Sequence, residues 1–502
     1  MYFWLNIKNH SQPKLVNMSK INLIGRVEEI AILEQTLVSP VSEFVAVYGR
    51  RRVGKTFMVR EFYDKTICFE LVGMFKASLQ EQLSNFAQAL RKATGFGILP
   101  QKPASWQEAF FQIENYLESP LVKENPGKRV VFFDELPWLN TPRSGFLNAL
   151  EHFWNSFGSR QKNLVLVVCG SAASWMIQHI VRSRGGLHNR LTRQIRLLPF
   201  SLSETEKYLS SKNVTLTRFQ IVELYMAFGG VPYYLTQVEP GLSAAQIIDK
   251  SCFTMNGLLR QEYEKLYASL FEDSQYHTKI VELLAKKTKG ISRNELLAAT
   301  NISSGGTATR ILEELEESGF IESYIPYGKM AKDALFRLSD EFTQFYFDWI
   351  KPLGKKSPGN GYWLTQQNQP VKNSWAGFTF ENICIKHVQK IKNTLGISGI
   401  ETNHAAWRYQ PSPDSPLPGA QIDLLIDRRD AAINLCEIKF SNSEFVIDAK
   451  YAAELRQKKE VFRQVTKTRK NVFITLITSF GMVQNAYSRE LVASSLTLDD
   501  LF

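Results

Sequence analysis

The chain has 502 residues, which is too many for one hydrophobic core and suits three or four domains of roughly 100–200 residues each. Hydrophobic residues make up 44% of it and charged residues 22%, as in ordinary soluble proteins, and no apolar run approaches the roughly 20 residues of a membrane span. The net charge of +11 favours a phosphate-rich partner, although many proteins without one are mildly basic. Five scattered cysteines, none in a C-x-x-C pair, indicate a reducing cytoplasm and argue against zinc or a disulfide framework.

The N-terminus begins with an apolar stretch that is too short for a signal peptide and has no cleavage site. Met18 opens the segment MSKINLIGR. Residues 1–17 are therefore either an artefact of an upstream start or a loose tail, and we expect residues 1–20 to lie outside the first domain.

A glycine-rich, basic stretch near the N-terminus has the spacing of a phosphate-binding loop. Residues 49–56 read G-R-R-R-V-G-K-T, a full match to G-x-x-x-x-G-K-[ST]. The apolar run FVAVYG before it predicts a buried strand, and FMVREFYD after it has helical spacing. In that setting the loop N–H groups point at phosphates, Lys55 reaches the β- and γ-phosphates, and the Thr56 hydroxyl binds Mg²⁺. The predicted nucleotide-binding residues here are Gly49, Arg50, Arg51, Arg52, Val53, Gly54, Lys55 and Thr56.

Two further apolar runs predict strands that end in polar residues. Asp134 and Glu135 follow the first run. We expect Asp134 to hold Mg²⁺ through its water shell and Glu135 to polarise the attacking water. Ser171 follows the second run, where many ATPases with such a loop place a polar sensor of the γ-phosphate. The alternative for the two carboxylates is an acidic strand end in a solvated loop.

The segment RGGLHNRLTRQIRLLPFS contains Arg184, Arg190, Arg193 and Arg196. One of them, with Arg190 and Arg193 as our candidates, would act as an arginine finger in cis or from a neighbouring subunit. A basic surface strand is the equally weighted alternative. The later segment FGGVPYYL has glycines at a helix end and a proline that restarts a helix, which is typical of a helical lid.

The motifs IGRVEEIAIL, the phosphate loop, FFDELPWL, CGSAASWM, RQIRLLPFSLSE and GGVPYYL occur in this order. This arrangement closely resembles the archaeal-type AAA+/STAND-like ATPases, over roughly Ile21 to Leu270. The resemblance implies ATP and Mg²⁺ as cofactors. No unambiguous finger motif appears, so activation by a neighbouring subunit is left open.

The segment from Tyr276 to Lys329 predicts three short helices and a β-hairpin. Ser292 and Glu295 have the spacing of a capping box, and Gly319 ends the third helix. This is the order of a winged helix, whose third helix would contact DNA. That helix carries four glutamates against Arg310 alone, so packing against the nucleotide domain or a partner is the favoured alternative.

The C-terminal segment AQIDLLIDRRDAAINLCEIKFS predicts two strands joined by a turn. The first carries Asp423, and the second carries Glu437 and Lys439 on one face. If the strands pair, Asp423 lies beside Glu437, and two such carboxylates suit a hard divalent cation while Lys439 stabilises the developing charge. The alternative is a surface hairpin in which Lys439 neutralises Glu437.

The pattern D-x(13)-E-x-K resembles the PD-(D/E)XK nuclease superfamily, with Ile422 in place of the usual proline before Asp423. The resemblance implies that Glu381, on a preceding amphipathic helix, completes the metal site. The basic helix YAAELRQKKEVFRQV follows, and Arg456, Gln457 and Lys458 are candidates to contact phosphate.

The sequence as a whole predicts an α/β protein with a P-loop NTPase (AAA+-like) domain, a helical lid, a winged helix and a C-terminal α/β PD-(D/E)XK nuclease-like domain. The predicted boundaries are tail 1–20, ATPase core 21–200, lid 201–270, winged helix 271–350, connector 351–371 and nuclease-like domain 372–502. We expect a cytoplasmic ATPase whose nucleotide state controls a DNA-binding, Mg²⁺- or Mn²⁺-dependent nuclease-like domain without membrane contact. A non-cleaving C-terminal binding domain, a winged-helix transcription regulator and a homo-oligomer remain alternatives.

Overall fold

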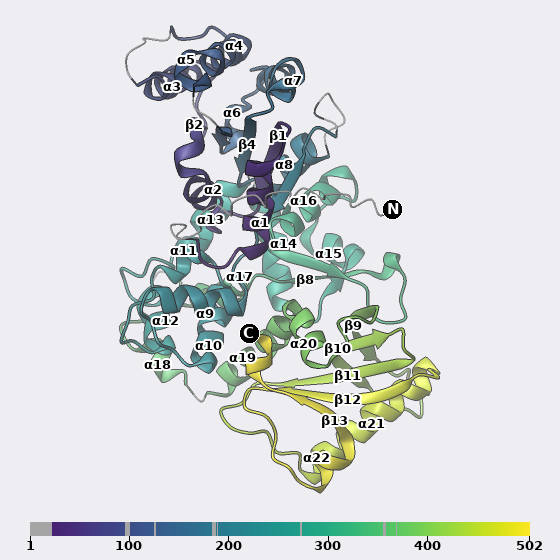
Figure 1. The fold of residues 1–502 in the computed structure, drawn as a ribbon. Helices are drawn as coiled ribbons and strands as arrows, with labels where there is room; N and C mark the ends of the chain where they lie inside the picture. Colours follow the sequence, from purple (N-terminus) through teal and green to yellow (C-terminus); the bar gives the residue numbers. More distant parts are fainter. Residues whose placement is uncertain are drawn as a thin grey trace, which may run out of the picture.

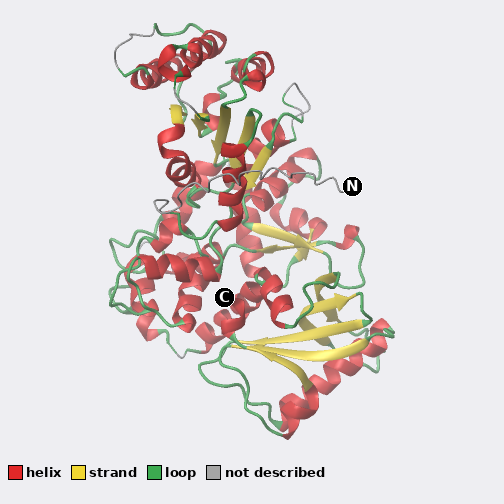
Figure 2. Cartoon of the chain, in the orientation of Figure 1, coloured by secondary structure: helices red, strands yellow, loops and turns green. Residues whose placement is uncertain are grey.

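The computed structural model describes residues 23–95, 101–124, 127–182, 187, 189–271, 274–354, 358–367 and 369–502. The predicted tail and Arg184 lie outside the described residues. In the part of the chain that is described, no helix is long and apolar enough to cross a membrane. The chain runs from an N-terminal sheet through a helical middle region to a second large sheet at the C-terminus (Figures 1 and 2).

The N-terminal part is built on a five-stranded parallel sheet with the strand order β2-β3-β4-β1-β5 (Figure 1). Its strands are β1 (Glu43–Tyr48), β2 (Ile67–Val72), β3 (Arg129–Asp134), β4 (Leu164–Gly170) and β5 (Arg193–Arg196). Its helices are α1 (Val27–Val38), α2 (Lys55–Tyr63), α3 (Leu79–Ala93), α4 (Trp106–Glu118), α5 (Pro120–Lys123), α6 (Leu136–Leu139), α7 (Phe146–Ser156) and α8 (Ala173–Met176).

Successive side chains of each strand point to opposite faces of this sheet and contribute to two separate hydrophobic cores. On β1, Phe44 and Ala46 join the core under α3, α4 and α7, whereas Val45 and Val47 join the core under α1 and α2. A parallel sheet that is covered on both faces needs apolar residues at successive positions, which is why the strand sequences are almost continuously hydrophobic. The carboxyl ends of β1, β3 and β4 are thereby held at one edge.

The segment predicted as a lid forms α9 (Leu202–Ser211), α10 (Arg218–Phe228), α11 (Pro232–Leu235), α12 (Ala244–Cys252) and α13 (Glu262–Leu270). Gly229 and Gly230 have φ angles of 65° and 66° and end α10, and Pro232 begins α11, as the sequence predicts.

The next segment forms α14 (Ser274–Lys286), β6 (Ile291–Ser292), α15 (Arg293–Thr300), α16 (Gly306–Glu317), β7 (Ile321–Tyr324) and β8 (Leu335–Leu338). The predicted capping box is confirmed, since the Ser292 hydroxyl accepts from the Glu295 N–H and the Glu295 carboxylate accepts from the Ser292 N–H. Gly319, with φ 75°, follows the end of α16. The strands form a small antiparallel sheet in the order β6-β8-β7.

The C-terminal part contains a mixed five-stranded sheet in the order β13-β12-β11-β10-β9 (Figure 1). The pairs β9–β10 and β10–β11 are antiparallel, and β11–β12 and β12–β13 are parallel. The strands are β9 (Thr402–Tyr409), β10 (Ala420–Arg428), β11 (Ala432–Lys439), β12 (Asn471–Thr478) and β13 (Val492–Leu496). The helices are α17 (Glu341–Phe345), α18 (Tyr362–Thr365), α19 (Pro370–Lys386), α20 (Val388–Thr394), α21 (Ala449–Thr466) and α22 (Ala486–Leu491).

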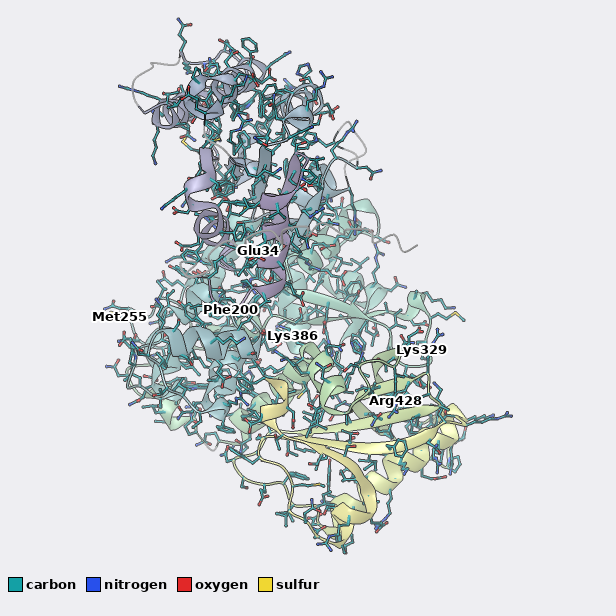
Figure 3. All side chains as sticks on the ribbon, in the orientation of Figure 1. Glu34, Phe200, Met255, Lys329, Lys386 and Arg428 are labelled. Carbon is teal, nitrogen blue, oxygen red and sulfur yellow. The ribbon has the colours of Figure 1, made fainter. Side chains whose placement is uncertain are left out.

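One hydrophobic core runs without interruption from the lid to the C-terminal sheet, from Phe200 to Leu501. Figure 3 shows Phe200 and Lys386 in the middle of the molecule, between the two large sheets. The segment predicted as a connector takes part in this core, because Trp363 is only 1% exposed. The backbone N–H of Trp363 also donates to the Asp249 carboxylate at 2.7 Å. The described part of that segment is therefore packed against the lid and is not a free linker.

Candidate functional site

The loop Gly49–Gly54 connects β1 to α2, whose first two residues are Lys55 and Thr56, and this is the strand–loop–helix setting that the sequence predicts. Gly49 and Gly54 have φ angles of 143° and 92°. A Cβ on Gly49 would lie 2.2 Å from the carbonyl oxygen of Leu197, so this position accepts only glycine. The loop opens at the carboxyl edge of the sheet, beside the ends of β3 and β4.

Lys55 and Thr56 are held by groups at this edge. The Lys55 ammonium donates to the carbonyl oxygens of Gly49 and Arg50, both at 2.9 Å, and to the Ser171 hydroxyl at 3.2 Å. Burial lowers the pKa of Lys55. The Thr56 hydroxyl donates to Asp134 Oδ2 at 2.8 Å. The cation and the two Mg²⁺-ligand candidates therefore converge on the space above the loop.

Glu135 and Ser171 form the other side of this site. The Ser171 hydroxyl donates to Glu135 Oε1 at 2.6 Å, and the Ser171 N–H donates to Oε2 at 3.1 Å. Glu135 has a φ of 48°, an uncommon backbone conformation for a non-glycine residue and one that clusters at functional sites. Ser171 thus holds the carboxylate in one orientation while also contacting Lys55.

The three arginines of the loop direct their side chains to other partners. Arg50 forms an ion pair with Asp340, and Arg52 forms a two-pronged ion pair with Glu262 at 2.8 and 3.1 Å. The Arg51 guanidinium lies 5.7 Å from the centroid of the Trp138 ring. The side chains of Arg50 and Arg52 are therefore engaged with carboxylates, and at these two positions only the backbone N–H groups are available to bind a phosphate.

The arginine finger candidates lie at two places. Arg193 pairs with Val45 of parallel β1, and its side chain reaches Glu43 at 3.8 Å, at the opposite end of the strand from the phosphate loop. A contact of Arg193 with the nucleotide, in cis or from a neighbouring subunit, stays a prediction. Arg190 is exposed in the turn before β5, and its contact with a nucleotide, in cis or from a neighbouring subunit, stays a prediction.

Arg196, which follows on β5, has a different partner. Its guanidinium donates at 3.0 Å to the carbonyl oxygens of Glu316 and Glu317, at the end of α16. Cations at a helix C-terminus stabilise its unpaired carbonyls. Arg196 thereby links the N-terminal sheet to the segment predicted as a winged helix.

This parallel α/β sheet, with a glycine loop, a lysine and two carboxylates at its carboxyl edge, defines a phosphate-binding NTPase domain. Residues 23–238 match the family model described as an ATPase domain predominantly from Archaea. The N-terminal module is therefore an ATPase domain. The match ends before Glu262 and Asp340, the partners of the loop arginines.

Other comparisons extend beyond this module. The chain is 25% identical over 364 residues to the uncharacterized protein MJECL04 of Methanocaldococcus jannaschii, covering 72% of this chain and 76% of that protein. The Walker-type ATPase PABY2304 of Pyrococcus abyssi is 17% identical, with a TM-score of 0.48, covering 65% of this chain and 96% of that one. The ORC2 protein of Aeropyrum pernix is 14% identical, with a TM-score of 0.39, covering 76% and 98% respectively.

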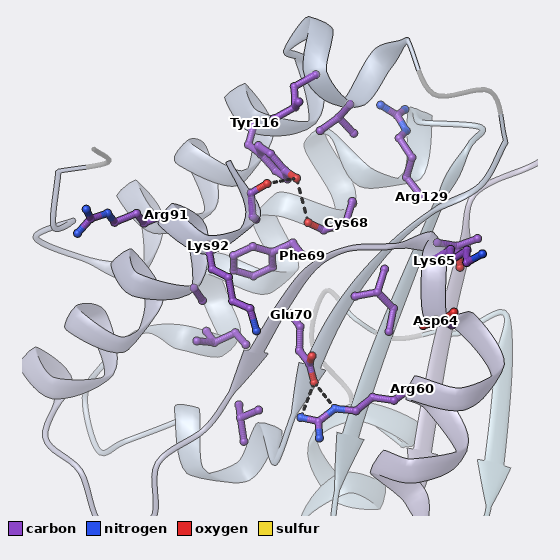
Figure 4. Close-up of a pocket in the computed structure, with 18 of the residues that line it drawn as sticks. Arg60, Asp64, Lys65, Cys68, Phe69, Glu70, Arg91, Lys92, Tyr116 and Arg129 are labelled. Carbon is purple, nitrogen blue, oxygen red and sulfur yellow. Dashed lines mark hydrogen bonds and ion pairs between the residues drawn. The ribbon is translucent and has the colours of Figure 1, made fainter. Parts of the chain in front are cut away.

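A cavity of about 1380 Å³ lies beside the edge strand β2, away from the chemistry described above (Figure 4). None of the predicted nucleotide-binding residues lines it. Tyr116 donates to the carbonyl oxygen of Cys68 at 2.9 Å, and Arg60 is paired with Glu70 at 2.7 Å. The size of this cavity does not make it the nucleotide site, because it lacks the phosphate loop and the two strand-end carboxylates.

The second predicted site lies on β10 and β11 of the C-terminal sheet. Leu424 pairs with Cys436, so extending this antiparallel register by one residue places Asp423 opposite Glu437, as predicted. Cys436 and Ile438 point into the core that the sheet shares with α19. The neighbouring residues Asp423, Glu437 and Lys439 therefore share the other face.

The Glu437 carboxylate is almost fully buried, and only one of its two oxygens has hydrogen-bond partners. Its Oε2 accepts from the Lys458 ammonium at 2.7 Å and from the Tyr451 hydroxyl at 3.2 Å, and it lies 4.0 Å from the Lys439 ammonium. Its Oε1 is buried without a hydrogen-bond partner. Burial and the nearby charge of Asp423 raise the pKa of Glu437, while Lys458 opposes that shift.

Glu381 of α19 lies close enough to Asp423, Glu437 and Lys439 for their charges to act on it. Burial and the negative charge of Asp423 raise the pKa of Glu381 to about 8. Across the described ranges, no group of three or more His, Cys, Asp and Glu side chains has the spacing of a metal site. Asp423, Glu437 and Glu381 as metal ligands therefore stay predictions.

Two predicted phosphate contacts on α21 have other partners. Lys458 is bound to Glu437 and Glu454, and Arg456 is paired with Glu490 at 2.6 Å. Sequence reasoning also missed Tyr451, about two helical turns before Lys458. The 7-residue spacing of these two residues on an amphipathic helix was the available signal, since it places them on one face.

Proposed function

We propose that ATP binding and hydrolysis in the N-terminal domain control a C-terminal domain that binds DNA and cleaves it with Mg²⁺ or Mn²⁺. The N-terminal module would be of the AAA+/STAND-like type, with the lid and a winged helix following it. The unsatisfied buried oxygen of Glu437, the residue opposite Asp423 in the strand register, carries the cleavage part of this proposal. A buried carboxylate oxygen without a donor is costly unless a cation or a proton completes it.

At the N-terminal site, Thr56 and Asp134 would hold Mg²⁺, which neutralises phosphate charge when it is bound. Lys55 is positioned to exchange its carbonyl partners for phosphate oxygens. Glu135, held by two hydrogen bonds from Ser171, would orient the attacking water and accept its proton. Release of the Glu135 carboxylate from Ser171 would then accompany binding of the γ-phosphate.

At the C-terminal site, Asp423 and Glu437 would hold a divalent cation, which lowers the pKa of bound water and stabilises phosphate charge. Lys439 has an ammonium 4.0 Å from Glu437 and is one-third exposed, so it can face a substrate phosphate. The Ile438 N–H lies 3.5 Å from Asp423 Oδ2 and helps to orient that carboxylate. Exposed polar and basic residues of α21, such as Gln457 and Arg463, would follow the DNA backbone.

The segment predicted as a winged helix supports an internal role better than DNA recognition. The last turn of α16 is bound by Arg196 through its carbonyl oxygens. Glu314 of the same helix is paired with His277 and Arg310, and Glu316 accepts from Ser323. These contacts engage Glu314, Glu316 and the end of α16 within the chain, which argues against the transcription regulator as the leading function.

The test combines nuclease, metal-binding and ATPase assays on the full chain. Asp423→Ala and Lys439→Ala should abolish Mn²⁺-dependent cleavage of plasmid or oligonucleotide DNA while leaving ATP turnover intact. Calorimetric titration with Mn²⁺ should show loss of a binding event in Asp423→Ala. If both variants cleave DNA like the parent, the site is assigned to the wrong residues.

A non-cleaving C-terminal binding domain is the second candidate, and the position of Lys458 favours it. An ammonium 2.7 Å from Glu437 Oε2 already supplies positive charge where a metal would. In that case the parent protein binds DNA but yields no product over hours with Mn²⁺ supplied. A homo-oligomer in which exposed Arg190 reaches a neighbouring nucleotide is compatible with either candidate and is tested by the loss of turnover in Arg190→Ala.

A further inference from the structure

The phosphate loop is anchored from outside the ATPase domain by two carboxylates. Arg50 is paired with Asp340, 290 residues further along the chain, and Arg52 with Glu262, 210 residues further along. Asp340 is the N-cap of α17, and Glu262 is the first residue of α13. Both carboxylates lie beyond residues 23–238, the part that matches the ATPase family.

The Arg50–Asp340 pair is shielded from water. Both side chains are 2% exposed, and the guanidinium lies 4.8 Å from the centroid of the Phe320 ring. Arg50 Nε and Nη2 are buried without a hydrogen-bond partner. Asp340 is therefore the one carboxylate that compensates this buried charge in the described structure, and its loss would leave an isolated cation in an apolar setting.

The Arg52–Glu262 pair is geometrically well formed and less buried on the arginine side. Its guanidinium makes two hydrogen bonds to the carboxylate and stacks 3.8 Å from the centroid of the Tyr233 ring in the lid. Arg52 has a φ of 76°, an uncommon backbone conformation that the surrounding contacts must hold. Two residues of the phosphate loop, Arg50 and Arg52, are thus held from α17 and from the lid.

We propose that Asp340 and Glu262 are positioning residues for ATP, which hold the phosphate loop in its binding shape through Arg50 and Arg52. The ATP site is then incomplete without the lid and α17. Because coupling between two parts of a protein is reciprocal, ATP must in turn stabilise α17 and α13. This inference depends only on the ATPase site, so it stands or falls independently of DNA cleavage.

Only a few contacting residues link Asp340 to the C-terminal module. The next residue, Glu341, is buried and paired with Lys386 at 2.6 Å, at the end of α19. The same helix carries Glu381 of the C-terminal site. A change at the phosphate loop therefore reaches the C-terminal module through two adjacent acidic residues and one lysine.

The decisive variant is Asp340→Asn in the full chain. The Asp340 carboxylate also caps α17, accepting from the Thr343 N–H at 3.0 Å and from its hydroxyl at 2.6 Å. Asparagine keeps this capping ability and removes only the charge. We expect the Kd for a fluorescent ATP analogue to rise at least tenfold, since the binding-competent loop is then a minor population. The kcat at saturating ATP should change less than about threefold, because Asp340 touches no reacting group.

Two comparisons separate this role from a general loss of stability. Glu322→Gln breaks the Arg337–Glu322 pair of the β7–β8 hairpin and should leave the Kd within about twofold of the parent. In an Arg50→Met background, adding Asp340→Asn should weaken ATP binding no further. If Asp340→Asn leaves the Kd unchanged, or still weakens binding in that background, the proposal is overturned.

Hydrogen exchange on the unmodified protein provides a test that needs no variant. A non-hydrolysable ATP analogue should slow exchange of the α17 and α13 amides at least threefold, as reciprocity requires. An unchanged exchange rate in both helices, with the analogue bound at saturation, overturns the proposal even if no variant can be purified.

Discussion

His387 holds the C-terminal module against the lid as an uncharged ring. Its Nδ1 lies 2.8 Å from the Ile383 carbonyl oxygen, and its Nε2 accepts the Leu202 N–H of α9 at 3.1 Å. Since a backbone N–H can only donate, Nε2 carries no proton and Nδ1 donates to the carbonyl. Burial lowers the pKa of His387 to about 4; the nearby charges of Lys386 and Lys390 act in the same direction, and the Ile383 carbonyl opposes them.

The sign of the pH effect follows from this shift. The ordinary pKa is 6.5 and the folded value is about 4, so the unfolded chain takes up the proton first as the pH falls. The stabilising contribution is present above pH 6.5 and is lost between pH 6.5 and 4. At about 1.4 kcal/mol per unit, the loss is about 3 kcal/mol in all, of which about 2 kcal/mol is gone by pH 5.

The assay is urea unfolding of the parent and His387→Gln between pH 7.5 and 4.5. Glutamine cannot titrate, so the difference in unfolding free energy between the two proteins should shrink by about 2 kcal/mol from pH 7.5 to 5. His152→Gln changes an exposed histidine on α7 and should follow the parent at every pH. Parallel curves for the parent and His387→Gln would refute the assignment of a neutral, buried His387.

Three further changes test the two candidate sites. Glu135→Gln should retain ATP affinity but lower turnover by about 10²–10⁴-fold in a phosphate-release assay, and a normal rate would exclude it as the general base. Gly49→Ala should cost about 3 kcal/mol or more in thermal unfolding, because its Cβ would overlap the Leu197 carbonyl oxygen; an unchanged melting temperature contradicts the loop geometry. Lys458→Met should destabilise the fold by about 3 kcal/mol by removing the ammonium nearest to the buried Glu437 carboxylate, and Mn²⁺ should restore part of the loss; no response to Mn²⁺ argues against a metal there.

The sequence predicts best those features that depend on neighbouring residues. The glycines and Lys55 of the phosphate loop, the capping box at Ser292 and the hairpin that places Asp423 opposite Glu437 each require only a few consecutive positions. Strand alternation and helix capping are local rules, so a single sequence is enough to apply them.

Long-range pairing was beyond the sequence for a physical reason. The arginines of the phosphate loop look like phosphate ligands because proximity in sequence is all that a motif reports, yet Arg50 and Arg52 find carboxylates more than 200 residues away. Periodicity says which face of α21 is apolar, but not that Lys458 turns toward Glu437. The Gly- and Pro-rich composition around Trp363 likewise indicates a domain boundary, but it does not predict that Trp363 packs against the lid.

The shared core limits how ATP can act on the C-terminal module. Phe219 of α10 stacks on Phe440 and Phe480 at 4.9 and 5.1 Å between ring centroids, and Trp375 of α19 lies in the same continuous core. Each large apolar side chain contributes about 1.5–3 kcal/mol when buried, so exposing half a dozen of them costs about 10 kcal/mol or more. Coupling between sites typically amounts to about 1–3 kcal/mol, which is too little to separate the modules.

The proposed nucleotide control would therefore work by small adjustments of polar contacts, of which the Glu341–Lys386 pair between α17 and α19 is the best placed. Small-angle X-ray scattering tests this directly, because a released C-terminal module would increase the radius of gyration by several ångströms. We expect the radius to agree within about 1 Å between nucleotide-free protein and protein saturated with a non-hydrolysable ATP analogue. A clear expansion in either state would mean that the core between the lid and α19 opens, and that the energy of burial has been overestimated.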